Sequence, residues 1–330
     1  MKVDVESARE HVAQELRDSG KFLLTTHENP DGDALGSLAA MNAILLQLGK
    51  DCVMFMSEEE YPLPYEYQDL PLDGVVHELP PDATERTIVF LDCGNIDRMP
   101  VSFLGRDEAH IVNIDHHHDN TNFGTANLVV DGASCTAEIV WQLAHDLGAD
   151  ITPPIADALY VGLVTDTGKF MYENTTPESH RMAAELIEHG VNPHEVFRRL
   201  FESVPLAKLH LLARVLARAE RYDDGRLTIS FIKREDFAET GADENDVEGI
   251  VDHMRAVRGT VVGALVREQL KEGREGISKV SLRASSDDVD VSRIARQQGG
   301  GGHRQAAGFS SELPPDELVA FIRGEIASQY

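Results

Sequence analysis

The sequence predicts an α/β protein of two domains, in which an N-terminal domain with a parallel sheet precedes a smaller C-terminal α/β domain. The first observation is an alternation, up to about residue 200, of short apolar runs with stretches of helical spacing. This alternation is typical of a parallel sheet covered by helices. The second observation is a change of pattern after that point, where strand-like runs are separated by turn-rich gaps. We therefore expect domains at 1–200 and 221–330, joined by a helical linker at 201–220.

Apolar spacing gives the elements of the first domain in order. The segment 33–48 is expected to be a helix because leucine and methionine recur there at intervals of three and four residues. Gly49 directly follows and is a favourable stop for it. Around this helix we expect a helix at 8–18, strands at 21–26 and 52–56, an irregular segment at 57–81, strands at 87–91 and 111–114, and helices at 133–147, 154–164, 177–189 and 194–200.

Apolar runs and turn residues also indicate the elements of the second domain. A long helical stretch at 207–220 is expected to link it to the first domain, and Asp223-Asp224-Gly225 is a typical turn. A second turn-rich gap lies at 272–276. The remaining expected elements are strands at 227–232, 259–266 and 280–283, a glycine run at 299–302, and a final helix at 315–328.

Composition narrows the classes of function. The chain has 330 residues and a formal net charge of −27, which argues against tight binding of long duplex nucleic acid, since that requires a broad basic surface. No apolar run approaches the roughly 18–20 residues of a membrane span. Three widely spaced cysteines, Cys52, Cys93 and Cys135, are typical of reduced thiols rather than a disulfide framework. We expect a cytoplasmic protein with no membrane partner.

Aspartate and histidine residues gather at four separated stations along the chain. Each station follows an apolar run or opens a helix, and the carboxyl ends of parallel strands are where open α/β sheets bind ligands. A charged aspartate at the end of a buried strand is unfavourable unless its carboxylate binds a ligand. The stations are His27 with Asp31 and Asp33, then Asp92, then Asp115-His116-His117, then Asp166.

Each station also has a simpler interpretation. Asp33 alone is a favoured N-terminal cap of the helix that it opens, and Asn29-Pro30-Asp31-Gly32 alone is a turn. Those interpretations weaken when His27 joins them at a strand end. Three consecutive histidines from His116 to His118, beside Asp115, favour metal binding over a structural role.

The types of ligand atom in these motifs narrow the choice of metal ion. Mixed carboxylates and imidazoles suit Mn²⁺, Zn²⁺ or Fe²⁺, whereas an all-oxygen site would suit Mg²⁺ or Ca²⁺. Four aspartate charges would balance two divalent cations, which allows an anionic phosphate to approach. In such a pair, a bridging carboxylate and a bridging hydroxide hold the metals roughly 3.5–4 Å apart, and the hydroxide is the nucleophile.

These motifs resemble those of the DHH phosphoesterase superfamily. Asp115-His116-His117 is its name-giving motif, and the other three stations match its remaining metal motifs. The segment Gly300-Gly301-Gly302-His303, followed by Ala306-Ala307-Gly308-Phe309, is similar to the signature of the DHH-associated domain. Within the superfamily, the chain is most similar to the two-domain oligoribonucleases, or nanoRNases, that also dephosphorylate phosphoadenosine phosphate (pAp). The matching motifs span 27–309, nearly the whole chain.

The resemblance implies a role for each residue. Two manganese ions are expected, of which one would be held by His27 and Asp31 and the other by Asp33, His116 and Asp166. Asp92 would bridge the two ions. His117 would contact the substrate phosphate, Asp115 would orient a neighbouring histidine, and His118 lies outside the motif. The active site would lie in the cleft between the two domains, and a homodimer is plausible.

The second domain is expected to bind the substrate. Successive glycines let the backbone approach a ligand and point N–H groups at it, although Gly299 to Gly302 alone are as readily a flexible loop. With His303, a tight turn against phosphate becomes the favoured interpretation of Gly300, Gly301 and Gly302. By resemblance, Arg283 would bind substrate phosphate or base; otherwise it is an exposed strand-end arginine. Arg304 is a weaker candidate, and Arg98 is expected to hold the Asp92 loop or the cleft.

The predicted function is hydrolysis of short oligonucleotides to mononucleotides with manganese, together with phosphatase activity on pAp. One alternative is hydrolysis of cyclic di-AMP or its linear product pApA. A second alternative, a non-catalytic nucleotide-binding regulator, would predict a missing metal ligand, and none is missing. Partners would be short oligonucleotides or small nucleotide phosphates.

Overall fold

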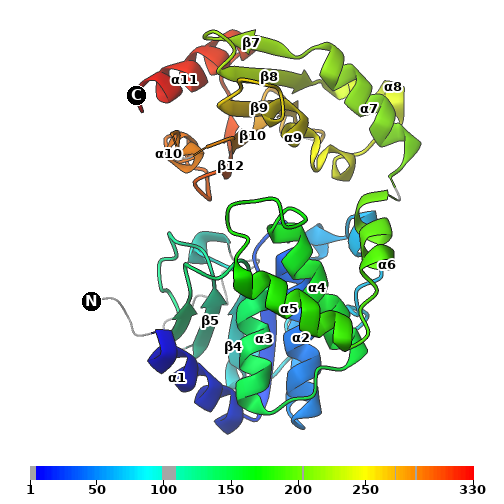
Figure 1. Cartoon of the computed structure of the whole chain (residues 1–330), viewed down its shortest axis with the longest axis vertical. Coiled ribbons are helices and arrows are strands. Elements are labelled where there is room, and N and C mark those ends of the chain that lie inside the picture. The colour runs from blue at the N-terminus through cyan, green and yellow to red at the C-terminus, as the bar shows by residue number, and fades with distance from the viewer. Residues whose placement is uncertain (1–4, 99–108, 203, 272, 287) are drawn as a thin grey trace. The chain divides into compact units, whose positions relative to one another are not determined.

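The computed structural model describes residues 5–98, 109–202, 204–271, 273–286 and 288–330. The chain forms two compact units, Met1–Ser203 and Val204–Tyr330, which Figure 1 shows as blue-to-green and green-to-red halves. The predicted α/β class and the order of a parallel-sheet domain before a smaller domain are confirmed. In the described part of the chain, no helix is long and apolar enough to span a membrane.

Unit 1 (Met1–Ser203) is built on a six-stranded parallel sheet of order β3-β2-β1-β4-β5-β6. Because all strands run the same way, their carboxyl ends share one edge. In this order β1, the first strand in the chain, lies in the middle of the sheet. The strands are β1 (Lys21–Thr26), β2 (Asp51–Phe55), β3 (Val75–Val76), β4 (Thr87–Leu91), β5 (Ile111–Asp115) and β6 (Ala126–Val129).

Helices cover one face of this sheet (Figure 1). Phe22 and Leu24 of β1 pack in the large helix-lined core, whereas Leu23 packs in a smaller cluster on the other face. Burial of both faces explains why the strands read as continuous apolar runs. The helices are α1 (Val5–Asp18), α2 (Gly32–Gln47), α3 (Thr136–Leu147), α4 (Pro153–Asp166), α5 (Pro177–Glu188) and α6 (Pro193–Phe197), with a π-helical turn at Arg198–Glu202.

Strands β3 and β6 were not expected from the sequence. β3 has only two residues and lies within a segment that otherwise contains short 3-10 turns, Glu58–Glu60 and Tyr65–Tyr67. β6 has four residues, of which Asn127 is polar. Both are edge strands that form by pairing with a neighbour, so local periodicity carries little signal for them.

Unit 2 (Val204–Tyr330) contains a second sheet, of order β11-β12-β10-β9-β8-β7, in which only the β8–β9 pair is parallel. Alternate residues face two cores; on β9, for example, Ala264 faces one and Leu265 the other. The strands are β7 (Glu220–Tyr222), β8 (Leu227–Ile232), β9 (Val262–Glu268), β10 (Ser278–Ala284), β11 (Gly301–Gly302) and β12 (Ala306–Ser311).

The helices of unit 2 are α7 (Leu206–Ala217), α8 (Arg234–Thr240), α9 (Ile250–Arg255), α10 (Val291–Arg296) and α11 (Pro315–Ala327). Helix α7 lies within the segment expected to link two domains. Its Leu211 and Val215 are fully buried in a core shared with Phe237 of α8 and Met254 of α9. Strand β12 and helices α8, α9 and α10 were not anticipated, because each is short and lacks a clear period.

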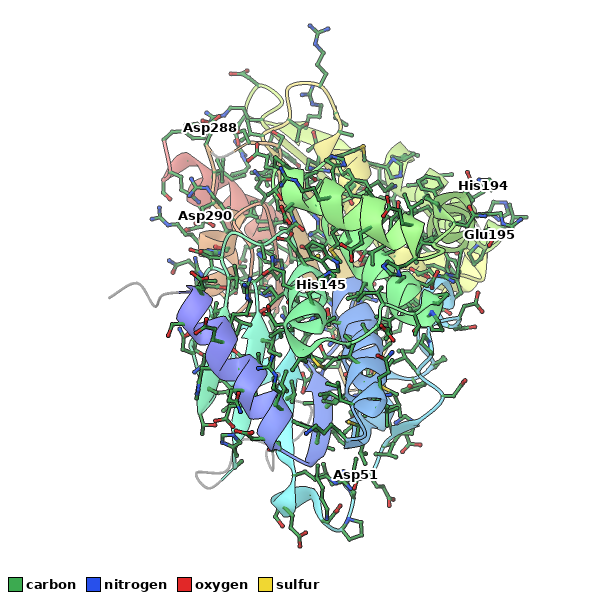
Figure 2. The ribbon with its side chains drawn as sticks, turned by 60° about the horizontal axis from the view of Figure 1, so that its bottom comes forward. Asp51, His145, His194, Glu195, Asp288 and Asp290 are labelled. Atoms are coloured by element: carbon green, nitrogen blue, oxygen red, sulfur yellow. The ribbon has the colours of Figure 1, made fainter. Side chains whose placement is uncertain are left out.

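Most acidic side chains lie on the surface, as the strongly negative composition requires. Figure 2 labels examples, and Asp51, Glu195 and Asp288 are exposed. Among the described residues, five aspartates are buried: Asp33, Asp92, Asp115, Asp236 and Asp246. The first three lie together at the carboxyl edge of the parallel sheet, where the candidate site is found.

Candidate metal centre

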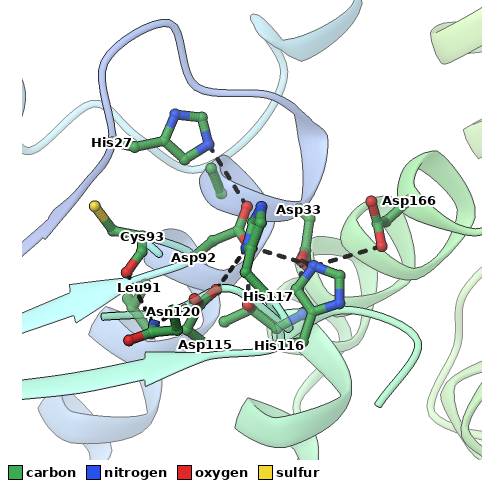
Figure 3. A network of polar contacts seen from close by, with 12 residues as sticks. His27, Asp33, Leu91, Asp92, Cys93, Asp115, His116, His117, Asn120 and Asp166 are labelled. Carbon is green, nitrogen blue, oxygen red and sulfur yellow. Dashed lines mark hydrogen bonds and ion pairs between the residues drawn. The ribbon is translucent and has the colours of Figure 1, made fainter. Parts of the chain in front are cut away.

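The four stations of unit 1 meet at the carboxyl edge of the parallel sheet (Figure 3). His27 follows β1, Asp92 follows β4, and Asp115 ends β5. Asp166 follows an apolar run, as expected, and that run is helix α4, of which Asp166 is the last residue. Asp33 lies in the first turn of helix α2. The site thus combines strand ends with helix ends.

Asp92 is the centre of the arrangement. Its carboxylate lies 3.6 Å from Nε2 of His27, from Nε2 of His116 and from Nδ1 of His117. It also accepts a hydrogen bond of 3.0 Å from the Thr136 hydroxyl. Burial alone would raise the pKa of Asp92, but the three imidazoles outweigh it and hold that pKa below its ordinary value. The carboxylate is therefore ionised.

Asp31, rather than Asp33, caps helix α2. Oδ1 of Asp31 accepts from the backbone N–H groups of Asp33 and Ala34 at 3.0 and 3.1 Å, as the side chain of an N-terminal cap does. The alternative role for Asp33 as the cap of its own helix is therefore excluded. Asp31 is exposed, and one of its carboxylate oxygens lies within 4.8 Å of a ligand atom of His27 and of Asp92.

Asp33 instead binds the start of a different helix. Its Oδ2 accepts from Thr136 N at 2.6 Å and its Oδ1 from Ala137 N at 2.9 Å. These N–H groups belong to the first turn of α3, where unpaired donors and the helix dipole favour an anion. Burial and the neighbouring charges of Asp92 and Asp166 nevertheless raise the pKa of Asp33 well above its ordinary value. A cation beside it would relieve that repulsion.

His116 faces three carboxylates. Its Nε2 lies 3.9 Å from Asp33 Oδ2, 3.6 Å from Asp92 Oδ1 and 3.7 Å from Asp166 Oδ2, as Figure 3 shows in part. Burial and the like charges of Asp31 and Asp92 raise the pKa of Asp166 to about 7, although the imidazoles lower it. In the described residues, the ion-pair partners of Asp33, Asp92 and Asp166 are all histidines.

His117 points to a separate network. Its Nδ1 lies 2.7 Å from Asp115 Oδ1, and Asn120 Nδ2 donates to Asp115 Oδ2 at 2.5 Å. Asn120 also donates to Asn113 Oδ1 at 2.8 Å. Burial lowers the pKa of His117, but the charge and hydrogen bond of Asp115 outweigh it and raise that pKa to about 10. Asp115 therefore orients the His117 ring and favours its imidazolium form.

His27 has two contacts at one ring nitrogen. Its Nδ1 lies 2.7 Å from the carbonyl oxygen of Glu28 and 2.8 Å from Nη2 of Arg98. The carbonyl needs a proton on Nδ1, whereas the guanidinium needs a lone pair there. Loading Nε2 with a cation places the proton on Nδ1 and selects the Glu28 contact. The contact of Arg98 Nη2 with the Glu28 carbonyl, at 3.4 Å, does not require that lone pair.

These residues fit two divalent cations. The ligand atoms of His27, Asp31 and Asp92 lie within 4.8 Å of one another, and so do those of Asp33, Asp92 and His116. The two groups share Asp92, and Asp166 lies beside the second. Buried carboxylates with only imidazoles for ion-pair partners form a donor set that suits transition metals. Unit 1 therefore brings together every residue predicted to bind metal.

The candidate substrate residues lie in unit 2, on adjacent strands. Arg283 of β10 pairs with Ala306 of β12, and its guanidinium lies 3.9 Å from Asp252 Oδ1. His303 sits in the turn between β11 and β12, where its N–H donates to the carbonyl of Ala306 at 2.7 Å. Arg283 is thus partly buried against an acid rather than an exposed strand-end arginine.

The glycine run has a structural reason that the sequence did not reveal. A Cβ on Gly300 would lie 2.2 Å from the carbonyl oxygen of Gly308, and one on Gly302 would lie 2.5 Å from that of Ala306. Gly302 also has a φ of 127°. Gly301 is exposed with open space around its Cβ position. Two of the three glycines are therefore required by the β11–β12 hairpin itself.

Several site residues were missed by sequence reasoning. Thr136, Asn120 and Asn174 hold the carboxylates by hydrogen bonds, and Asn113 accepts a hydrogen bond from Asn120. None lies in a run of metal-binding residue types. Only their proximity to Asp33, Asp115 and Asp166 in the folded chain reveals them.

Comparison with known proteins agrees with this geometry. The family model "DHH family, N-terminal domain" matches residues 21–163, and the DHHA1 domain model matches residues 224–327. The bifunctional oligoribonuclease and PAP phosphatase NrnA of Thermus thermophilus is 36% identical over 301 residues, covering 88% of this chain and 83% of that protein. NrnA of Bacillus subtilis is 26% identical, covering 88% of each protein.

Solved structures share the fold. An exopolyphosphatase-related protein from Bacteroides fragilis has a TM-score of 0.85 at 22% identity, covering 99% of this chain and 98% of that one. RecJ of Thermus thermophilus, in complex with Mn²⁺, has a TM-score of 0.55 at 15% identity, covering all of this chain and 55% of RecJ. At these identities the likeness concerns the fold alone.

Proposed function

Since the chain belongs to the DHH family and is a hydrolase of phosphoester bonds, we propose that it releases mononucleotides from short oligonucleotides and also dephosphorylates pAp. The observation that carries this proposal is Asp92, shared between two groups of potential metal ligands. A relative that is 36% identical over 88% of the chain is named as both an oligoribonuclease and a PAP phosphatase. The strongly negative charge is compatible with a short substrate and opposes a long one.

Two manganese ions are proposed as the cofactor. His27, Asp31 and Asp92 would hold one, and Asp33, His116, Asp166 and Asp92 the other. When bound, the pair would supply an activated water as nucleophile and neutralise charge on the phosphoryl oxygens. Hydrogen bonds within the protein orient two of these ligands, since N–H groups of α3 bind Asp33 and the Thr136 hydroxyl binds Asp92.

His117 is proposed to contact the substrate phosphate. Asp115 raises its pKa to about 10, which favours the cationic form, and Asn120 fixes Asp115 in turn. A preorganised imidazolium beside the metal ligands would stabilise negative charge that grows on the phosphoryl oxygens in the transition state. Arg283, Gly300, Gly301, Gly302 and His303 of unit 2 are proposed to bind the rest of the substrate.

The test is product analysis on labelled RNA and DNA of two to ten nucleotides, with pAp and pApA assayed in parallel and Mn²⁺ present. We expect mononucleotide products, fastest turnover on the shortest chains, and conversion of pAp to AMP and phosphate. Preference for pApA over all short RNA would favour a role in cyclic dinucleotide turnover. Absence of manganese-dependent hydrolysis of every substrate would overturn the proposal.

A further inference from the structure

Asn174 lies in the loop between α4 and α5 and binds Asp166 twice. Its Nδ2 lies 3.1 Å from the carboxylate Oδ2 of Asp166 and 3.1 Å from the backbone carbonyl of the same residue. The same Nδ2 donates to the carbonyl of Ser134 at 2.8 Å. A contact to both the backbone and the side chain of Asp166 restricts the rotation of that side chain about χ1.

The orientation of the Asn174 amide follows from its partners. All three neighbours of Nδ2 are acceptors, so the nitrogen and not the oxygen must face them. Its Oδ1 is buried and has no hydrogen-bond partner among the described residues. A buried acceptor without a hydrogen bond destabilises the fold. The position of the Asn174 side chain therefore satisfies the three acceptors around Nδ2 and leaves its own Oδ1 without a hydrogen bond.

Asn127 of β6 provides the contrast. Its Nδ2 donates to the carbonyl of Gly124 at 2.8 Å, and its Oδ1 accepts from the N–H of Gly124 at 2.9 Å. This is the arrangement of an asparagine that only closes a turn, with both ends of its amide satisfied. It lies on the edge strand β6, and its amide bonds Gly124 rather than a candidate metal ligand.

The contact with Ser134 connects Asn174 to the second carboxylate of the centre. Ser134 lies two residues before Thr136, whose N–H binds Asp33. One asparagine thus joins Asp166 to the segment that holds Asp33, and these two carboxylates lie on two sides of His116 Nε2. The group Asp33, His116 and Asp166 is the proposed second metal position.

The loop that carries Asn174 has a constrained backbone. Gly168, Lys169 and Phe170 all have positive φ, at 54°, 64° and 61°, and such a run of left-handed residues is uncommon outside glycine. A Cβ on Gly168 would lie 2.4 Å from the ring of Tyr172. Phe170 stacks on His180 of α5 with ring centroids 5.0 Å apart. These contacts hold the loop against α5 at the point where Asn174 reaches Asp166.

We propose that Asn174 is a positioning residue that orients the Asp166 carboxylate and thereby sets the affinity of the second metal position without contacting substrate. This inference rests on the proposed two-metal function. Hydrogen-bond partners of metal ligands commonly contribute about 10- to 100-fold to metal affinity. The effect would fall on one of the two positions, because His27 and Asp31 lie outside the hydrogen bonds that Asn174 makes.

The experiment is a titration of metal-free protein with Mn²⁺, followed by the electron paramagnetic resonance signal of the free ion. Asn174→Leu keeps the branched shape of the side chain and removes the donor, and Asn127→Leu is the matched control. For Asn174→Leu we expect one of two manganese ions to bind about 10- to 100-fold more weakly, with the other unchanged. The variant should require more Mn²⁺ for half-maximal turnover and recover most of its kcat at saturating Mn²⁺.

For Asn127→Leu we expect a lower Tm and wild-type binding of both ions. Binding of both ions at wild-type affinity by Asn174→Leu, or equal weakening of both, would overturn the role of Asn174. The proposed function would survive that result if the wild type still hydrolyses dinucleotides. Two-site binding that changes as expected, in a protein that hydrolyses no nucleotide, would overturn the substrate assignment alone. If Asn174→Leu does not fold, Asn174→Ala is read by the same criteria.

Discussion

At the scale of single residues, Asp92 stands out because its backbone is strained. Its φ of 59° lies in the left-handed region, which is uncommon for residues other than glycine and is tolerated best by asparagine and aspartate. Its N–H remains bonded to the carbonyl of Ile114 at 3.0 Å. Residues held in such conformations cluster at functional sites. Here the turn directs the carboxylate toward three imidazoles.

Asp92→Asn keeps the shape of the side chain and halves its capacity as a bridging ligand. We expect affinity for both manganese ions to fall by more than about 100-fold, since loss of an outer hydrogen-bond partner alone costs 10- to 100-fold. Hydrolysis should become undetectable. Metal titration and turnover of a dinucleotide measure both effects. Asp131→Asn, a change of an exposed acid in the same unit, should alter neither, and two tightly bound ions in Asp92→Asn would contradict the shared-ligand geometry.

Asp115 sets the charge state of His117. Because Asp115 raises the pKa of His117, the imidazolium persists below that raised pKa and is lost as pH rises through it. Asp115→Asn removes the stabilising charge, so the pKa of His117 should fall. We expect the alkaline limb of the kcat profile to move to lower pH, while manganese binding stays within a few fold of wild type. An unchanged alkaline limb would argue against His117 as the charged contact.

At the scale of elements, helices α2 and α4 approach each other through glycine. A Cβ on Gly36 of α2 would lie 2.4 Å from the carbonyl oxygen of Ala158, and one on Gly162 of α4 would lie 2.7 Å from Ala137 and 2.8 Å from Asp33 Oδ1. Close packing of this pair therefore brings α4 directly against a proposed metal ligand. The packing of α4 and the position of the Asp33 carboxylate therefore both depend on the absence of a side chain at Gly162.

Gly162→Ala tests this dependence. Overpacking in a core costs about 1–3 kcal/mol, and here the added methyl group would also displace the Asp33 carboxylate. We expect a lower Tm together with weaker binding at the second metal position. Gly36→Ala should lower Tm with a smaller effect on metal, because its contact is with the Ala158 backbone. Gly20→Ala, where a Cβ meets nothing within 4 Å, should behave as wild type.

The elements also show how far sequence reasoning reaches. The central strands β1, β4 and β5 were predictable because both of their faces are buried, which leaves continuous apolar runs ending in His27, Asp92 or Asp115. Strand β12 was not, since it forms by pairing with β10 and contains three small residues and two serines. The role of Asp33 at the start of α3 depends on a contact between positions 103 residues apart, which no local pattern encodes.

At the scale of the whole molecule, the two units carry different kinds of candidate residue. All proposed metal ligands lie in unit 1, whereas Arg283, His303 and the glycine run lie in unit 2. Each unit has its own sheet and its own buried core. Metal binding and substrate binding should therefore respond separately to substitution.

Arg283→Ala should separate the two functions. Loss of a cation that binds phosphate should raise KM about 10-fold or more, on the order of the 1.5–3 kcal/mol of a charged hydrogen bond. Manganese stoichiometry and affinity should not change. Arg274→Ala, which removes an exposed arginine of the same unit, serves as the control for net charge. Loss of manganese from Arg283→Ala would contradict the division of roles between the units.

The hydrogen bonds at Asp33 have a consequence for the choice of ion. Oδ1 accepts from Ala137 N and from the Ser37 hydroxyl, and Oδ2 accepts from Thr136 N. Each carboxylate oxygen has two lone pairs, so one lone pair, on Oδ2, remains for a cation. Asp33 can therefore coordinate through a single oxygen only. Ca²⁺ prefers six to eight oxygens and often takes both from one carboxylate, so it should occupy this position poorly and fail to support turnover.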